Sequence, residues 1–156
     1  MKILMVCLGN ICRSPIADGL LRQKVNEEHL DVEVDSAGTI GLHAGSAPDP
    51  RMIATAKNRG TDISFLKARQ FTVADFEKFD VIFAMDKNNK RDILSLGKTT
   101  EDKQKVHLLL SGISDQEEAN VPDPYYGTSK DFEHVYDLVD KATNTIIQKI
   151  KNNTLI

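Results

Sequence analysis

Short apolar runs alternate with amphipathic stretches along most of this 156-residue chain. The apolar runs predict strands at 2–7, 32–38, 80–85 and 105–110. Apolar residues at helical spacing, together with local capping signals, predict helices at 15–29, 48–59, 72–79, 88–96 and 129–152. Continuous apolar strands between helices are typical of a parallel sheet covered on both faces. The pattern therefore predicts an α/β fold, in which ligands bind beyond the carboxyl ends of the strands.

Polar residues mark where several of these elements begin and end. Ser14 followed by Pro15 predicts a helix start, Gly60 a helix end and Thr72 the cap of a short helix. Residues 111–128 read as a polar loop, and the Lys/Glu-rich segment 101–118 as a solvated face. We find no repeat, low-complexity tract or linker, so residues 1–156 are expected to form a single domain.

Composition limits the classes of function. The net charge of −3 gives no general reason to expect binding to nucleic acid or acidic membranes. The apolar run from Ile3 to Leu8 is too short for a signal-peptide core or a membrane span. Both cysteines, Cys7 and Cys12, lie in one motif, which favours a reducing compartment over a disulfide framework. We expect a cytoplasmic protein without membrane insertion, although signal-independent release stays open.

The segment that follows the first strand carries the clearest chemical signal. It consists of Cys7, Leu8, Gly9, Asn10, Ile11, Cys12, Arg13 and Ser14. Such a loop can point its N–H groups inward around an anion, and the helix that follows adds its positive end. Gly9 and Asn10 tolerate positive φ angles, and Arg13 can hold two phosphate oxygens. These features favour a thiolate at Cys7 beside a bound phosphoryl group.

Two other interpretations of this loop compete with a phosphate site. A buried cysteine at the end of a strand, followed by a tight turn, would need no chemistry. A nucleotide-binding loop is excluded, because the segment matches neither GxGxxG nor GxxxxGK[ST]. We therefore favour a phosphate site without a nucleotide.

A second segment, "VPDPYY" at 121–126, offers an acid. Transfer of a phosphoryl group from tyrosine to Cys7 leaves a phenolate, and protonation helps it to depart. Prolines on either side stiffen the backbone around Asp123, while Tyr125 and Tyr126 could form aromatic walls. From these residues alone, a plain turn with packing tyrosines explains the segment equally well.

The motifs taken together resemble the low-molecular-weight protein tyrosine phosphatase family. The resemblance rests on "VCLGNICRSP", "DSAGT", "DPR", "FDVIFAMD" and "VPDPYYG", and it spans nearly the whole chain. It implies a four-stranded parallel sheet with helices on both faces and a phosphate-binding loop after the first strand. It also implies a phosphocysteine mechanism that uses no metal or other cofactor.

Site roles follow from the resemblance residue by residue. Cys7 would be the nucleophile, Arg13 the phosphate ligand and Asp123 the general acid. The expected supporting residues are Ser14 for the thiolate, Asn10 and Ser36 for the shape of the loop, and Asp86 for the pocket. Leu42, Tyr125 and Tyr126 would line the substrate cleft.

The chain departs from the family pattern at two positions. Leu66 stands where many members carry a histidine that supports the loop asparagine. Leu42 stands where bacterial relatives often carry a tryptophan. We therefore expect fewer partners for Asn10 and altered substrate contacts on the wall at Leu42.

Rival functions can be ranked from the same residues. Protein arginine phosphatases of this type carry threonine where this chain has Ile11, and arsenate reductases need cysteines downstream of Cys12. A phosphopeptide-binding module needs neither Cys7 nor Asp123, and a thiol–disulfide oxidoreductase would more often show C-x-x-C. Metal-ligand spacing is absent from the four histidines, His29, His43, His107 and His134.

The remaining expectations concern partners and redox behaviour. We expect phosphotyrosine-containing proteins as substrates and a monomeric or weakly dimeric enzyme. Cys7 and Cys12 lie in one curled loop, so a disulfide between them could protect Cys7 against peroxide. The alternative is that Cys12 only packs beneath the loop.

Overall fold

A four-stranded parallel sheet forms the centre of the computed structural model, which describes residues 1–112 and 119–155. The strand order is β2 (Glu33–Gly38), β1 (Lys2–Cys7), β3 (Val81–Ala84) and β4 (Val106–Leu108). In the register, Ile3 of β1 lies between Val34 and Val81. The α/β class and the parallel sheet predicted from the apolar runs are confirmed.

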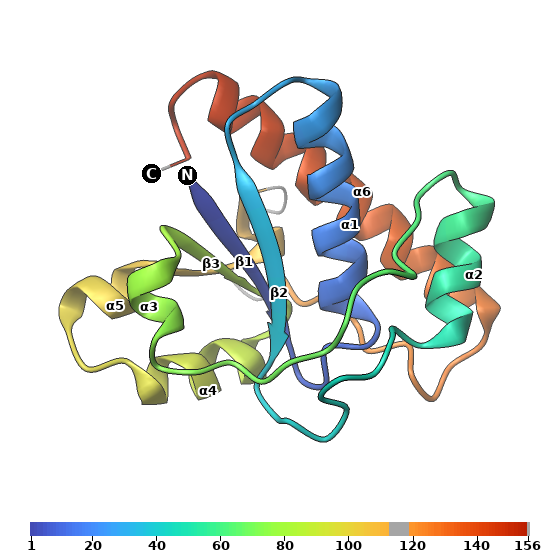
Figure 1. Cartoon of the computed structure of the whole chain (residues 1–156), viewed down its shortest axis with the longest axis horizontal. Coiled ribbons are helices and arrows are strands. Elements are labelled where there is room, and N and C mark those ends of the chain that lie inside the picture. Colours follow the sequence, from blue (N-terminus) through green and yellow to red (C-terminus); the bar gives the residue numbers. More distant parts are fainter. Residues whose placement is uncertain (113–118, 156) are drawn as a thin grey trace.

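Helices cover both faces of the sheet (Figure 1). On one side lie α1 (Arg13–Glu27), α2 (Pro50–Asn58) and α6 (Ser129–Lys151). On the other lie α3 (Asp75–Lys78), α4 (Lys87–Leu96) and α5 (Thr100–Gln104). Successive residues of β1 point to opposite cores, Ile3 and Met5 to one and Leu4 and Val6 to the other. This two-sided burial explains why the strand is apolar without interruption.

The bounds of α1 differ from the prediction at its start. The helix begins at Arg13, and Ser14 is not its N-cap, because the Ser14 hydroxyl turns inward toward the Cys7 thiol. At the other end, His29 takes a φ of 54°, and the Leu30 N–H reaches back to the Val25 carbonyl. The predicted end at His29 was close, but no glycine marks this left-handed cap.

The second helix follows its capping signals more closely. Asp49 caps α2 by accepting the Arg51 N–H at 2.8 Å, and Pro50 occupies the first turn. Gly60, with a φ of 88°, ends the helix as predicted: its N–H reaches the Lys57 carbonyl.

Shorter elements account for most of the remaining differences. Thr72 is not a helix cap; its N–H instead donates to the carboxylate of Asp75 at 2.8 Å, and α3 starts after Ala74. Helix α5 was not predicted, since its signal is a Thr99–Asp102 capping box within a polar segment. The residues of α5 are not buried, in line with the solvated face predicted for 101–118. The prediction is wrong for Val106, Leu108, Leu109 and Leu110, which are buried because β4 and the turn after it join the core, and 113–118 lie outside the described residues. Strand β4 is shorter than predicted, because a 3₁₀ turn follows from Leu109 to Gly112.

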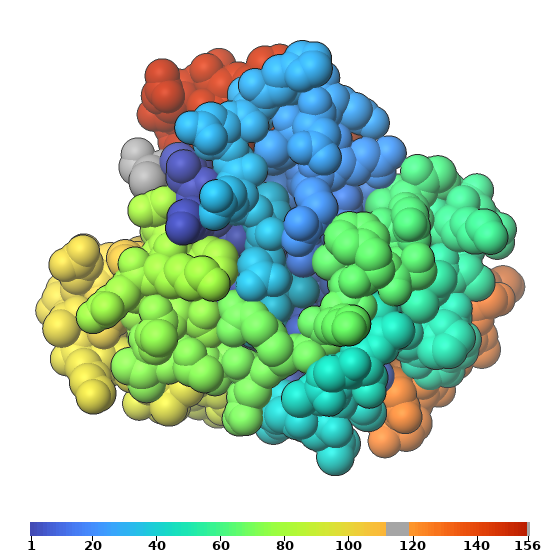
Figure 2. Space-filling view, in the orientation of Figure 1, coloured from blue at the N-terminus to red at the C-terminus, as the bar shows by residue number. Residues whose placement is uncertain are grey.

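Residues 39–69 leave the sheet and return to the same point. The Gly38 N–H donates to the Arg69 carbonyl at 2.8 Å, and the Gly38 carbonyl accepts the Phe71 N–H at 2.7 Å. A Cβ atom at Gly38 would lie 2.7 Å from the Leu8 carbonyl oxygen, so only glycine fits. We call residues 39–69 the excursion; it includes α2 and covers one side of the molecule, from cyan to green in Figure 2.

No helix in the described part of the chain is long and apolar enough to cross a membrane.

Candidate active site

The loop after β1 closes around the sulfur of Cys7. Cys7 ends β1 and is only 3% exposed. Its Sγ lies 3.0 Å from the Ser14 Oγ and accepts the Asn10 N–H at 3.3 Å. Asn10 takes a φ of 58°, the left-handed conformation that asparagine tolerates. Gly9 does not use a positive φ; its lack of a side chain instead leaves room for the His43 ring.

Asn10 is buried and bonded at both ends of its amide. Its Nδ2 donates to the Ser14 Oγ at 2.7 Å, and its Oδ1 accepts the Arg69 backbone N–H at 3.1 Å. Leu66 packs against the core instead of contacting this amide. The amide oxygen therefore has a backbone partner even though position 66 carries no histidine.

Arg69 is itself held by two carboxylates. Its guanidinium donates to both oxygens of Asp75, at 3.0 and 3.1 Å, and lies 3.1 Å from an oxygen of Asp35. These contacts fix the backbone segment that binds Asn10. No sequence motif marks this link, because the Arg69 atom that contacts the loop belongs to the backbone.

Ser36, expected to shape the loop, lies behind it. The residue is buried in β2, and its hydroxyl stands against the carboxylate of Asp18 in α1. The partner that β2 offers to the loop is the Ala37 carbonyl, 3.4 Å from the Ser14 Oγ. Ser36 thus lies beside Asp18 of α1.

Arg13 lies beneath the pocket with one edge of its guanidinium already engaged. Nη1 donates to Asp86 Oδ2 at 2.6 Å and to the Val121 carbonyl at 3.2 Å. Burial works against its charged form, but Cys7 and the Asp86 hydrogen bond outweigh burial and raise the pKa of Arg13. Asp86 also caps α4 through its other oxygen, so it orients Arg13 from a fixed position.

Asp123 faces the same pocket from the loop before α6. Its Oδ1 accepts the Tyr125 N–H at 3.1 Å, while its Oδ2 lies 3.7 Å from Arg13 Nη2. The side chain is 46% exposed. The Val121 N–H donates to the Met85 carbonyl at 2.8 Å and ties this loop to the end of β3.

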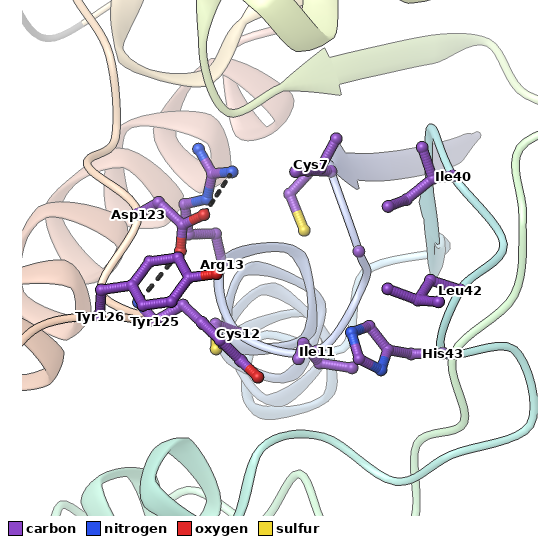
Figure 3. A pocket seen from close by; sticks show the side chains of 12 residues that line it. Cys7, Ile11, Cys12, Arg13, Ile40, Leu42, His43, Asp123, Tyr125 and Tyr126 are labelled. Carbon is purple, nitrogen blue, oxygen red and sulfur yellow. Dashed lines mark hydrogen bonds and ion pairs between the residues drawn. The ribbon is translucent and has the colours of Figure 1, made fainter.

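These groups line one cavity of about 210 Å³ (Figure 3). Cys7 and Arg13 lie at its base, and Asp123 stands beside Arg13. Tyr125 and Tyr126 form one wall, with their rings edge to face at 4.9 Å.

The opposite wall comes from the excursion and presents Ile40, Leu42 and His43. Ile40 and His43 were missed from the sequence, although both lie within two residues of Leu42. Leu42 is 77% exposed and Tyr126 96%, so the rim is open to a large partner.

Cys12 is a free, buried thiol near the base of the pocket. Burial raises its pKa to about 12, and the nearby Asp49 carboxylate adds to the shift. Cys12 is therefore protonated at neutral pH.

The histidines occupy separate places in the fold. His29 ends α1, His43 lines the pocket, His107 belongs to β4 and His134 to α6. Across residues 1–112 and 119–155, no three His, Cys, Asp or Glu side chains gather in a way that could hold a metal ion.

Comparison with known proteins agrees with this geometry. Residues 2–155 match the family model described as low molecular weight phosphotyrosine protein phosphatase. The enzyme of that name from Schizosaccharomyces pombe is 41% identical over 147 residues, which cover 92% of this chain and 93% of the relative. A protein tyrosine phosphatase from Entamoeba histolytica, solved with Hepes in its active site, superposes with a TM-score of 0.92 at 38% identity, covering 99% of both chains. Vibrio vulnificus Wzb in complex with benzylphosphonate gives a TM-score of 0.84 at 29% identity, covering 95% of this chain and 97% of that one. The chain belongs to the low molecular weight phosphotyrosine protein phosphatase family.

Proposed function

We propose that this protein hydrolyses phosphotyrosine in other proteins through a phosphocysteine intermediate on Cys7. One observation carries the proposal: the Cys7 sulfur, the Arg13 guanidinium and the Asp123 carboxylate line a single pocket. The arrangement combines a nucleophile, a phosphate ligand and an acid, which are the parts that phosphoryl transfer through a covalent intermediate needs.

In the first step, the Cys7 thiolate attacks the phosphorus atom of bound phosphotyrosine. The bond between phosphorus and the phenolic oxygen breaks, and that oxygen takes a proton from the Asp123 carboxyl group. Arg13 and the N–H groups of the loop hold the non-bridging oxygens as their charge is redistributed. Protonation matters because tyrosine has a pKa near ~10 and its phenolate leaves poorly at neutral pH.

In the second step, water attacks the phosphocysteine. The Asp123 carboxylate, which lost its proton in the first step, takes a proton from this water as the sulfur–phosphorus bond breaks. The electron pair returns to the Cys7 sulfur, which the Ser14 hydroxyl at 3.0 Å and the Asn10 N–H at 3.3 Å stabilise. Inorganic phosphate leaves and the starting state is restored. Apart from the substrate and this water, the scheme uses only groups of the chain.

The shape and chemistry of the pocket support an aromatic substrate. Tyr125 and Tyr126 offer ring faces and edges to a phenyl group, and Ile11 adds an apolar contact at the base. Benzylphosphonate, the ligand named for the Vibrio vulnificus Wzb structure, likewise joins an aromatic ring to a phosphorus group. Phosphoarginine is the second candidate, and parallel assays on phosphotyrosine, phosphoserine and phosphoarginine peptides separate them.

The remaining proposals concern domain organisation, cellular location, oligomeric state and redox sensitivity. We propose that residues 1–156 act as one phosphatase domain, in line with the family match over residues 2–155. The cytoplasmic location, the monomeric or weakly dimeric state and the redox sensitivity of Cys7 remain predictions from the sequence.

Replacement of Asp123 by asparagine tests the mechanism. The variant should lose about 10²–10⁴-fold in kcat on phosphotyrosine, since it can neither give nor take the proton. The defect in phosphoenzyme formation should shrink for aryl phosphates with more acidic phenols, because these leave without help. The defect in hydrolysis should be constant, because every substrate yields the same phosphocysteine. Pre-steady-state bursts across substituted phenyl phosphates measure both steps.

Cys7→Ser is the companion variant. It should abolish turnover and yet bind inorganic phosphate, because the loop and Arg13 are kept. Substantial turnover in this variant, or an Asp123→Asn defect equal for every leaving group, contradicts the proposed roles.

A further inference from the structure

Arg51, the last residue of the "DPR" motif, lies outside the pocket but touches the loop that carries Asp123. Its guanidinium lies over two rings, 4.7 Å from the centroid of Phe132 on α6 and 5.4 Å from that of Tyr125. Asp49 binds the other side of the guanidinium through Nε at 3.1 Å and Nη2 at 2.8 Å. A planar guanidinium suits this combination of stacking and bidentate pairing.

The start of α2 is fixed relative to the phosphate loop. The Asp49 N–H donates to the Ile11 carbonyl at 2.8 Å, and its carboxylate caps the helix. Arg51 is therefore held by a residue that is itself bonded to the loop around Cys7. The position of the guanidinium is set independently of Tyr125.

Tyr125 links Arg51 to Asp123, because its ring contacts Arg51 and its backbone contacts the Asp123 carboxylate. Its backbone N–H donates to Asp123 Oδ1 at 3.1 Å, which leaves Oδ2 on the side of Arg13 (Figure 3). Tyr125 is 38% exposed, and of residues 122–126 only Pro124 is buried. The contact with Arg51 thus restrains a segment that has little core packing of its own.

We propose that Arg51 is a positioning residue for the general acid. By holding the Tyr125 ring, it keeps Oδ1 of Asp123 occupied and Oδ2 directed into the pocket. The inference rests on the proposed function, in which Asp123 donates the proton. Two other roles would have different consequences. If Arg51 only supported α2, its loss would affect every aryl phosphate equally, and if it only contacted the substrate peptide, its loss would not affect aryl phosphates, which have no peptide.

The chain offers a matched control at the other end of α2. Arg59 follows the end of α2, pairs with Glu133 and Asp137, and lies 4.3 Å from the centroid of the Tyr136 ring. It makes the same kinds of contact as Arg51 but to a tyrosine of α6, away from Asp123. Arg59→Met removes a stacked, paired arginine without touching the acid loop.

The experiment compares kcat/KM for a series of substituted phenyl phosphates. Arg51→Met should lower kcat/KM for unsubstituted phenyl phosphate about 2- to 30-fold, the range expected for loss of a cation–π restraint. The loss should shrink as the phenol becomes more acidic, and Arg51→Lys should give a smaller loss of the same form. Arg59→Met should leave the dependence on the leaving group unchanged.

A second background separates the possible failures. In Asp123→Asn, adding Arg51→Met should cause no further loss that depends on the leaving group. Either of two results overturns the role of Arg51. In one, Arg51→Met lowers kcat/KM equally for every leaving phenol. In the other, Arg51→Met adds the same leaving-group dependence when Asp123 has already been replaced by asparagine. If the defect of Asp123→Asn alone does not depend on the leaving group, Asp123 is not the general acid, and the role of Arg51 fails with that assignment. Circular dichroism identifies a folding defect in Arg51→Met, in which case Arg51→Lys decides the outcome.

Discussion

Replacement of Asp18 by asparagine should remove a loss of stability that appears as the pH rises. Asp18 lies in α1 with a relative exposure of 0%. Its Oδ1 accepts two N–H groups of Arg22, at 3.0 and 2.9 Å, whereas Oδ2 has no hydrogen-bond partner among the described residues. Burial raises the pKa of this carboxyl from 3.8 to about 6, and the Arg22 pair offsets the effect only in part.

The sign follows from proton binding. A raised pKa means that the folded protein binds this proton more tightly than the unfolded chain does. The favourable contribution is therefore complete below about pH 4 and is lost as the pH rises through about 6. The difference between 3.8 and about 6 corresponds to about 3 kcal/mol of unfolding free energy, at 1.36 kcal/mol for each pH unit.

Urea unfolding of the wild type and Asp18→Asn between pH 4 and pH 7.5 tests this value. Relative to the wild type, the variant should gain about 2.4 kcal/mol between pH 4 and pH 7.5, because asparagine keeps the acceptor for Arg22 and does not ionise; the rest of the difference arises below pH 4. Asp62→Asn is the control: hydrogen bonds from Ser64 lower the pKa of Asp62 below 3.8, so its difference from the wild type should stay nearly constant over this interval and change only at lower pH. A difference between Asp18→Asn and wild type that is independent of pH would refute the reasoning.

Two further predictions concern the phosphate loop. Arg13→Lys should lower kcat/KM about 10²-fold or more, since an ammonium group cannot bond to Asp86 and Val121 and still face the phosphate. Inhibition by inorganic phosphate should weaken in parallel, and a normal affinity for phosphate would contradict this prediction. Cys12→Ser should recover less activity than the wild type when thiol is added after peroxide. Peroxide oxidises Cys7 to a sulfenic acid, and the Cys12 thiol then displaces water to form a disulfide, which added thiol reduces. Equal recovery in both proteins would leave Cys12 with a packing role only.

The strands and the convergence of the site could be predicted because few physical arrangements fit the pattern. A strand buried on both faces must be continuously apolar, as Ile3 to Cys7 is, and parallel strands bring their carboxyl ends to one edge. Cys7, at the end of the central strand β1, therefore had to lie at the edge where a ligand binds. The place of Asp123 in the same pocket could be inferred only from the family resemblance, because the topology of the sheet does not determine where a loop residue lies.

The missed details depend on backbone contacts and on burial, which single residue types do not encode. The bond from the Arg69 N–H joins the last residue of the excursion to Asn10, which lies 59 positions earlier in the sequence, and it involves no side-chain atom of residue 69. Ser14 has the composition of a helix cap, but the closing of the loop directs its hydroxyl to the sulfur. Asp18 cannot be distinguished in the sequence from other polar residues of α1, and only the fold shows that it is fully buried.

The closure of the excursion at Gly38 has a consequence for how this enzyme can diverge. Both ends of residues 39–69 are bonded at Gly38, and Thr39 and Arg69 are also bonded to the phosphate loop, at Cys7 and Asn10. The distance between the ends is thus set by the sheet and the loop, not by the length or composition of the tip near Leu42. Changes at that tip alter the surface offered to a partner protein while the geometry around the sulfur stays the same. Recognition can therefore evolve separately from chemistry within a single small chain.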